Sequence, residues 1–253
     1  MRIDVLSIFP EVFEPLMSTS IIGRARERGI IELNCHDLRD WSKHVHRKVD
    51  DYPYGGGGGM VMKAEPFFRF YDDLSEELER KNYSRQYVVM LSARGRPWKQ
   101  SVAFDFSKLE QLTLFCGHYK GIDARVEEIV DEELSLGDFV LSGGEIPAMA
   151  LIDSLCRLLP GAVGDRASIA GDSFYDGILG PPEYTRPECF RGLRVPEVLL
   201  GGNHALIEEW RRNKALDLTR ERRPELLSPS ASTEDGAARG EVEFENHEFN
   251  SAR

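Results

Sequence analysis

The segment from Gly137 to Ala148, with the sequence GDFVLSGGEIPA, constrains the fold of this chain more than any other. Its pattern predicts a short apolar strand over 138–142, a pair of glycines, and a helix with Pro147 in the first turn, where a missing N–H costs nothing. The apolar stripe of that helix extends to Leu159 and ends at a Pro-Gly pair. Glycines between the carboxyl end of a strand and the amino end of a helix bring bare backbone N–H groups close to a ligand. The glycine pair alone is equally consistent with a tight turn that binds nothing.

Short segments rich in Ile, Val, Leu and Phe alternate with helical patterns along the first 160 residues. The expected strands are Arg2–Phe9, Ile30–Leu38, Gln86–Ser92, Gln111–Gly117 and Asp138–Ser142. The expected helices are Glu11–Arg28, Glu65–Lys81, Gly121–Glu133 and Glu145–Leu159. Near-continuous apolar runs are typical of strands buried on both faces, and alternating strands and helices are typical of a parallel sheet covered by helices. The chain is therefore predicted to have an α/β fold with a mostly parallel sheet.

Three of the expected strands end in loops of small residues, at 92–95, 117–119 and 142–144. In open α/β sheets, ligands bind outside the carboxyl ends of the strands. We therefore expect the three loops to converge on one pocket. No GxGxxG motif follows the first strand, which disfavours classical dinucleotide binding.

The net charge of −11 argues against a nucleic-acid partner if it is taken for the whole chain. Its distribution weakens that argument, because residues 228–253 carry six acids against two arginines, whereas residues 186–223 carry nine bases against six acids. A locally basic segment on an acidic protein can still bind phosphates, since the attraction is short-ranged at physiological salt. A solvated helix face is the alternative explanation.

The composition changes in the last third of the chain. Residues 161–180 are rich in Gly, Ser and Asp with little periodicity, which indicates a mobile linker. Asn203 is the expected N-cap of a helix that runs toward Lys214, and a Ser-, Gly- and Glu-rich end follows. The predicted divisions are an α/β domain at 1–160, a linker at 161–180, a small all-helical domain at 181–227 and an acidic, disordered tail at 228–253.

The cysteines show neither a CxxC pair nor the spacing of a zinc site, which indicates reduced thiols in a reducing compartment. They are Cys35, Cys116, Cys156 and Cys189. No apolar run approaches the ~20 residues that a membrane span needs, and no basic segment followed by an apolar stretch begins the chain. The expected location is the cytoplasm, without a membrane partner.

Six motifs, all in the same order, carry a resemblance to a known family. They are IFP at 8–10, HRKVDDYPYGGGGGM at 46–60, CGHYKGIDARV at 116–126, LSGGEIPAMALIDSLCRLLPG at 141–161, DSFYDGILGPPEYTRPE at 172–188 and RRPELL at 222–227. Over roughly residues 1–227 the chain resembles the bacterial tRNA (guanine-N1)-methyltransferases of the TrmD type, which belong to the SPOUT class of S-adenosylmethionine enzymes. The resemblance implies a deep trefoil knot, a homodimer, and methylation of N1 of guanine 37 in tRNA.

The resemblance also implies the roles of particular residues. Asp172 would be the general base that removes the N1 proton, and Arg157 would stabilise charge that develops at O6. A lone Asp in a loop is otherwise more often a turn former or a cap. The residues implied to bind S-adenosylmethionine are Leu91, Ser92, Gly117, Tyr119, Leu136, Gly137, Asp138, Phe139, Val140, Leu141, Gly143, Gly144 and Pro147. The expected tRNA contacts are His46, Arg47, Lys48, Ser168, Arg186, Arg211, Arg212 and Lys214, for which solvated charged surface is the alternative.

One position departs from the family pattern. After Cys-Gly-x-Tyr, where the family usually has an acidic residue, this chain has Lys120. A carboxylate there could attract the α-ammonium or the sulfonium of the cofactor, or Mg²⁺, whereas a lysine would repel all three unless it points outward. The substitution puts a Mg²⁺ cofactor in doubt, and no other metal site is predicted. Nearby, Gly55–Gly59 lie between tyrosines and methionines, a composition that favours a tight loop with close approaches over a flexible linker.

The sequence thus predicts a SPOUT-class α/β methyltransferase with a mostly parallel, knotted sheet and a small all-helical C-terminal domain, acting on the anticodon stem-loop of tRNA. No protein partner other than a second copy of the chain is implied. One alternative is a SPOUT enzyme that acts on another RNA position or base; a ribose target is disfavoured, because Asp172 and Arg157 suit the removal of an N–H proton. Another is a non-catalytic RNA- or nucleotide-binding module, which Lys120 makes conceivable.

Overall fold

The computed structural model describes residues 1–83, 85–164 and 171–228 of the 253-residue chain. The chain divides into two compact units, Met1–Ile169 and Ala170–Arg253. Ser168, one of the predicted tRNA contacts, and residues 229–253 of the predicted acidic tail lie outside the described residues. Among the described residues, none of the helices combines the length and the apolar composition that crossing a bilayer requires.

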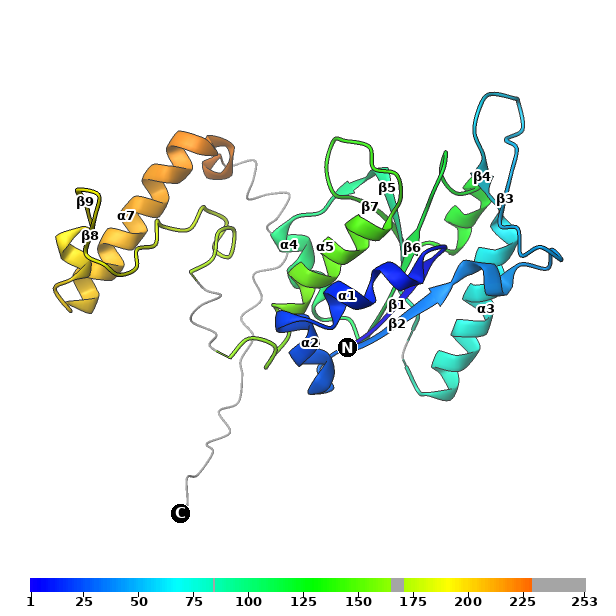
Figure 1. The fold of residues 1–253 in the computed structure, drawn as a ribbon, viewed down its shortest axis with the longest axis horizontal. Coiled ribbons are helices and arrows are strands. Elements are labelled where there is room, and N and C mark those ends of the chain that lie inside the picture. Colours follow the sequence, from blue (N-terminus) through cyan, green and yellow to red (C-terminus); the bar gives the residue numbers. More distant parts are fainter. Residues whose placement is uncertain (84, 165–170, 229–253) are drawn as a thin grey trace, which may run out of the picture. The chain divides into compact units, whose positions relative to one another are not determined.

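A five-stranded parallel sheet forms the centre of the first unit (Figure 1). Its strands are β1 (Arg2–Ser7), β2 (Glu32–Asp37), β5 (Val88–Pro97), β6 (Gln111–Cys116) and β7 (Glu132–Ser135), in the spatial order β2-β1-β6-β5-β7. In the centre of the sheet, Ile3 of β1 lies opposite Leu33 of β2 and Leu112 of β6. The predicted α/β fold with a parallel sheet is confirmed.

Helices cover both faces of this sheet (Figure 1). The elements between the strands are the 3-10 helices η1 (Pro10–Val12), η2 (Leu38–Trp41) and η3 (Ala124–Ile129), the helices α1 (Glu14–Met17), α2 (Ser20–Glu27), α3 (Ala64–Arg80), α4 (Gln100–Phe106) and α5 (Glu145–Cys156), and the antiparallel pair β3 (Asp50–Asp51) and β4 (Val61–Met62). One core lies between the sheet and α2, α4 and α5, and a second lies between the sheet and α3. Because successive side chains of a strand point to opposite faces, β6 contributes Leu112 and Leu114 to the first core and Phe115 to the second.

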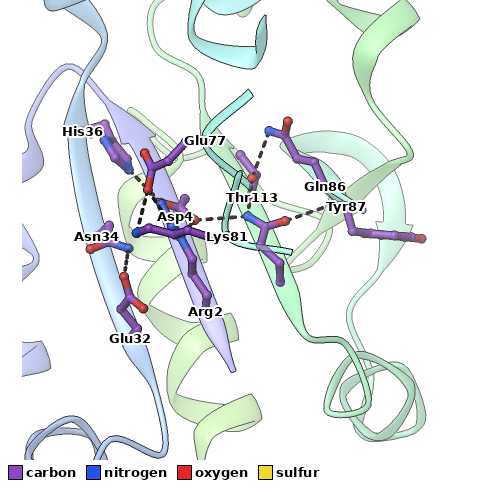
Figure 2. Close-up of polar contacts among 11 residues, drawn as sticks. Arg2, Asp4, Glu32, Asn34, His36, Glu77, Lys81, Gln86, Tyr87 and Thr113 are labelled. Atoms are coloured by element: carbon purple, nitrogen blue, oxygen red, sulfur yellow. Dashed lines mark hydrogen bonds and ion pairs between the residues drawn. The ribbon is translucent and has the colours of Figure 1, made fainter. Parts of the chain in front are cut away.

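A buried polar network lies at the amino ends of β1 and β6 (Figure 2). Arg2, only 2% exposed, donates hydrogen bonds to Asp4 at 2.8 and 3.0 Å and to Glu77 of α3 at 2.8 Å. Asp4 also contacts Nε2 of His36 at 2.9 Å and accepts a hydrogen bond from the side chain of Gln111 at 3.1 Å. A buried carboxylate is costly unless it is paired and hydrogen-bonded, so this arrangement ties β1, β2, β6 and α3 to one another.

The predicted strand over 138–142 is wrong, because these residues form a loop between β7 and α5. The fifth strand is β7 instead, which lies at the edge of the sheet and pairs with β5. Its two glutamates form ion pairs with arginines of β5. An edge strand tolerates such charges, so β7 lacks the apolar pattern that marks the central strands. The predicted helix over 121–133 is also wrong, because only the short η3 forms in this segment before β7 begins.

The predicted helices Glu65–Lys81 and Glu145–Leu159 are confirmed as α3 and α5, with ends that differ by up to three residues. The predicted helix Glu11–Arg28 is wrong as a single element, because η1, α1 and α2 take its place. Ser20 has a left-handed φ of 55°, which a continuous right-handed helix does not contain.

The second unit contains β8 (Cys189–Phe190), β9 (Leu193–Arg194), the 3-10 helices η4 (Glu197–Leu199) and η5 (Pro224–Leu227), and α7 (His204–Arg222). Asn203 caps α7 as predicted, its side chain accepting a hydrogen bond from the N–H of Leu206 at 3.4 Å. The prediction of an all-helical domain is wrong, because this unit also contains the antiparallel pair β8–β9. Its two-residue turn places Arg191 and Gly192 at φ values of 53° and 80°, the left-handed pair that suits a tight hairpin.

Candidate active site

A cavity of about 400 Å³ opens at the carboxyl ends of β6 and β7 and at a bulge within β5. Its wall consists of a bulge in β5, the loop after β6, and the loop between β7 and α5. All three loops that were expected to converge, at 92–95, 117–119 and 142–144, contribute to this one cavity, and Gly95 is the one residue of these loops that does not line it. Its size is ordinary for a site that takes a small molecule or a cofactor.

All but one of the residues predicted to bind the cofactor line the cavity; the exception is Asp138. The residues that line it are Leu91, Ser92, Gly117, Tyr119, Leu136, Gly137, Phe139, Val140, Leu141, Gly143, Gly144 and Pro147. The structure therefore brings these side chains and backbone groups together, and their role in binding a cofactor stays a prediction.

The first wall is a β-bulge, where a plain loop after a strand was expected. Both Leu91 and Arg96 of β5 lie opposite Leu134 of β7, so the residues between them are looped out of the pairing. A Cβ atom on Gly95 would lie 2.4 Å from the carbonyl carbon of Glu133, which only a glycine permits. Bulges often occur next to functional sites because they re-aim side chains, and this one brings Ser92 to the cavity wall.

The other two walls touch through their backbones at the glycine pair. The N–H of Gly144 donates to the carbonyl of Gly117 at 2.9 Å, and Gly143 forms a bridge with His118. A Cβ atom on Gly144 would lie 2.7 Å from Cα of Cys116. The glycine pair thus permits the close approach that was expected, and the segment that approaches it is the loop after β6. Full burial raises the pKa of Cys116 well above its usual value, so its thiol stays neutral beneath the cavity.

Lys120 remains part of the cavity wall. Its side chain lies along the glycine run: a Cβ atom on Gly59 would be 3.2 Å from Cγ of Lys120, and one on Gly57 would be 3.2 Å from Nζ. The N–H of Lys120 donates to the carbonyl of Met60 at 3.0 Å. The predicted close approach is therefore confirmed for Gly57 and Gly59, which lie against the lysine, whereas Gly55, Gly56 and Gly58 have open space around the position of a Cβ atom. Among the residues that the structure describes, no three His, Cys, Asp or Glu side chains are grouped so that they could hold a metal ion.

The two predicted catalytic residues lie in different units. Arg157 is the half-buried C-cap residue of α5 in the first unit. Asp172 is exposed in a turn of the second unit, where its backbone carbonyl accepts a hydrogen bond from the N–H of Tyr175 at 3.3 Å. Their joint action on one base stays a proposal.

The predicted tRNA contacts of the first unit lie in the loop between η2 and β3. Here His46 and Arg47 are exposed, and Lys48 is half-buried. Arg47 forms ion pairs with Asp40 and with Asp37, the latter at 3.4 Å. Exposed ion pairs are worth little, so a phosphate could replace these carboxylates at small cost.

The predicted tRNA contacts of the second unit are exposed, except Arg211, which is half-buried. Arg186 precedes β8, and the other residues are Arg211, Arg212 and Lys214 of α7. Arg211 pairs with Glu208 at 3.2 Å within the same helix. These side chains are accessible from solvent, and their contact with RNA stays a prediction.

Arg94 and His118 are two of the polar residues of the cavity wall that were missed as site residues in the sequence; Glu133, Ser135 and Ser142 are the others. Arg94 lines the cavity and donates to Glu127 and Glu133 at 3.1 Å each, and the charge of Glu133 raises its pKa. His118 lines it directly after Gly117. A polar side chain next to a glycine at the end of a strand is the signal that would have found both.

A parallel sheet that carries a cavity at the carboxyl ends of its strands defines an α/β protein of the ligand-binding kind. Within that class, the chain belongs to the family described as tRNA (Guanine-1)-methyltransferase TrmD, whose sequence profile matches residues 1–229. The resemblance inferred from the six motifs, and with it the prediction of an enzyme, is confirmed.

Relatives with a known assignment match nearly the whole chain. A protein of Ruminiclostridium cellulolyticum is 49% identical over 229 residues, which cover 90% of this chain and 97% of the relative. A protein of Heliobacterium modesticaldum is 52% identical, and the match covers 90% of this chain and 84% of the relative. A protein of Thermotoga maritima is 48% identical, and the match covers 90% of this chain and 90% of the relative. All three are called tRNA (guanine-N(1)-)-methyltransferase.

Proposed function

We propose that this protein transfers a methyl group from S-adenosylmethionine to N1 of guanine 37 in tRNA, next to the anticodon. The observation that carries the proposal is the cavity at the carboxyl edge of the sheet, which gathers twelve of the thirteen residues that the family motifs assign to the cofactor. The relatives named above support tRNA guanine as the substrate.

The cavity fits the proposed cofactor in size and in chemistry. Adenine needs backbone N–H and C=O groups beside an apolar slot, and the apolar side chains of Leu91, Leu136 and Leu141 line the wall beside the backbone of their loops. The Ser135 hydroxyl donates to the carbonyl of Gly137 at 3.1 Å and accepts from its N–H at 3.2 Å, which holds the start of that loop in place. When bound there, S-adenosylmethionine supplies an activated methyl group.

The residues of the chain would manage the proton and the charge of the guanine. In our proposal the carboxylate of Asp172 accepts the N1 proton as N1 takes the methyl group. The guanidinium of Arg157 stabilises negative charge that develops at O6. The walls of the cavity would hold the cofactor in a fixed orientation toward the guanine, which would contribute to the rate through orientation.

Binding of the anticodon stem-loop would use the basic residues of both units, since phosphate contacts position an RNA without reading its sequence. We also propose a homodimer in the cytoplasm. Its support within the first unit is the exposure of large apolar side chains, including Val12, Leu16 and Ile146. Mg²⁺ stays a doubtful cofactor, because Lys120 adds a positive charge to the cavity wall. The trefoil knot is likewise part of the proposal.

The test is incubation of the purified chain with methyl-labelled S-adenosylmethionine and an unmodified tRNA transcript that carries guanines at positions 36 and 37. A transcript with adenine at 37 is the control. We expect label only at N1 of guanine 37. The Asp172→Asn variant should bind the cofactor normally and lose about 10²- to 10⁴-fold in kcat.

Two results would refute the proposal in different ways. Cofactor binding by the wild-type protein without any transfer would indicate a non-catalytic binding module. Label at another nucleotide would indicate an RNA methyltransferase with a different target.

A further inference from the structure

Three side chains that are far apart in the sequence form a chain of hydrogen bonds beneath the cavity. Ser7, at the end of β1, donates from Oγ to Oε1 of Glu145 at 2.5 Å. The other carboxylate oxygen, Oε2, lies 2.7 Å from Nε2 of His118 in the loop after β6. Ser7 is fully buried, Glu145 is 7% exposed, and His118 lines the cavity.

In this series of hydrogen bonds, each donor faces an acceptor. A carboxylate oxygen only accepts, so the facing Nε2 of His118 is the donor. The hydroxyl of Ser7 donates to Glu145 and also accepts from the N–H of Phe9 at 2.8 Å. Glu145 is the first residue of α5, where the helix dipole favours a negative charge. A buried carboxylate with this set of partners is held in one position, because each alternative would leave it desolvated and unpaired.

Gly143 makes the contact between His118 and Glu145 possible. A Cβ atom at this position would lie 2.2 Å from Nε2 of His118 and 2.4 Å from Oε2 of Glu145. The backbone bridge between His118 and Gly143 and the contact between His118 and Glu145 therefore exist together. Both His118 and Gly143 line the cavity, so the imidazole lies where two of its walls meet.

We propose that Ser7, Glu145 and His118 form a positioning relay that sets the distance between the loop after β6 and the loop before α5, and thereby the affinity for S-adenosylmethionine. The relay rests on the proposed function. None of its members takes part in the proposed proton transfer at N1, which uses Asp172. Their effect is on the shape of the cavity: β1 holds Ser7, Ser7 orients Glu145, and Glu145 orients the imidazole that separates the two loops.

The test compares two replacements of the same histidine. The amide nitrogen of a glutamine can occupy the place of Nε2 and still donate to Glu145, whereas that of an asparagine corresponds to Nδ1 and is too short to reach it. We expect His118→Asn to weaken binding of S-adenosylmethionine about tenfold, the size of one lost hydrogen bond to a charged group. His118→Gln should recover most of that loss. Binding is measured by isothermal titration calorimetry on the full chain, with kcat and KM measured in parallel.

A matched pair of serine variants tests the buried end of the relay. Ser154 on α5 accepts a hydrogen bond from Nε1 of Trp98 at 3.0 Å and is not among the cavity residues. Ser7→Ala and Ser154→Ala each remove one hydroxyl from a hydrogen-bonded site of the first unit, and both should lower the thermal midpoint. Only Ser7→Ala should also raise the Kd and the KM for S-adenosylmethionine, with a smaller change in kcat.

The outcomes separate the relay from the proposed function. Failure of the wild-type protein to bind S-adenosylmethionine would overturn the function. Normal wild-type binding together with an unchanged Kd in His118→Asn and Ser7→Ala would overturn the relay alone. If His118→Gln and His118→Asn lose kcat equally while their Kd stays normal, the imidazole acts on the substrate itself and the positioning role is wrong.

Discussion

The buried network around Asp4 allows a quantitative test of what holds the first unit together (Figure 2). In the Asp4→Asn variant the side chain keeps its shape and loses its charge. One of the two oxygens that accept from Arg2, at 2.8 and 3.0 Å, becomes an amide donor. Arg2 is 2% exposed and would keep Glu77 as its charged partner. The variant therefore leaves the buried guanidinium of Arg2 with one of its two carboxylate partners.

Removing one partner of a buried ion pair costs about 3–5 kcal/mol of the free energy of unfolding. The remaining contact with Glu77 places this case at the lower end, at about 3 kcal/mol. For a unit of this size, each kcal/mol shifts the thermal midpoint by roughly 2–4 °C, so a decrease of about 10 °C is expected.

The pH dependence has a defined sign. Burial would raise the pKa of Asp4, but the hydrogen bonds from His36 and Arg2 outweigh burial and lower the pKa below its ordinary value of 3.8. A lowered pKa in the folded state means that the carboxylate stabilises the fold above the unfolded value, and that this stabilisation is lost as the pH falls through the folded value. The part of the difference between wild type and Asp4→Asn that comes from this charge should persist down to about pH 4 and disappear at lower pH.

The assay is urea denaturation followed by tryptophan fluorescence. In a Trp210→Phe background the remaining tryptophans, Trp41 and Trp98, both lie in the first unit and report on it alone. The matched control is Glu14→Gln, which breaks an exposed ion pair with Arg26 at 3.2 Å and should cost less than about 1 kcal/mol. If Asp4→Asn costs no more than this control, the network does not stabilise the fold in the way argued.

Two further predictions concern α7 and the thiols. Asn203→Ala removes the side-chain oxygen that accepts from the N–H of Leu206, and should lower the helix signal in circular dichroism and cost about 1 kcal/mol; an unchanged melting curve would contradict the assigned cap. Burial raises the pKa of Cys156 to about 11 and also raises the pKa of Cys116 well above its usual value, whereas Cys189 is exposed. At pH 8 a thiol reagent should therefore modify Cys189 in the native protein and the two buried cysteines only after unfolding, and rapid native labelling of Cys116 would show that the first core is more open than described.

Local sequence patterns were sufficient to predict the helices and caps that depend only on residues close together in the sequence. The period of apolar residues predicted α3 and α5, and the capping preference of asparagine placed the start of α7 at Asn203. The small residues at the ends of strands predicted which loops line the cavity. Local patterns failed at β7, since an edge strand with two glutamates has no apolar signature, and at Ser20, whose left-handed conformation divides one predicted helix.

The sequence by itself determined the family, the α/β class and most of the residues that line the cavity, because these depend on motifs and on the spacing of neighbouring side chains. Only the tertiary structure decided that β7 completes the sheet, that β5 bulges toward the cavity, and that Ser7 meets Glu145 across 138 positions of the chain. The contacts of Arg2 with Asp4 and Glu77 show the same dependence, since Glu77 lies 75 positions away on α3. Such partners are set by the order of the strands and by what each face of the sheet packs against, and no local pattern of residues encodes either of them.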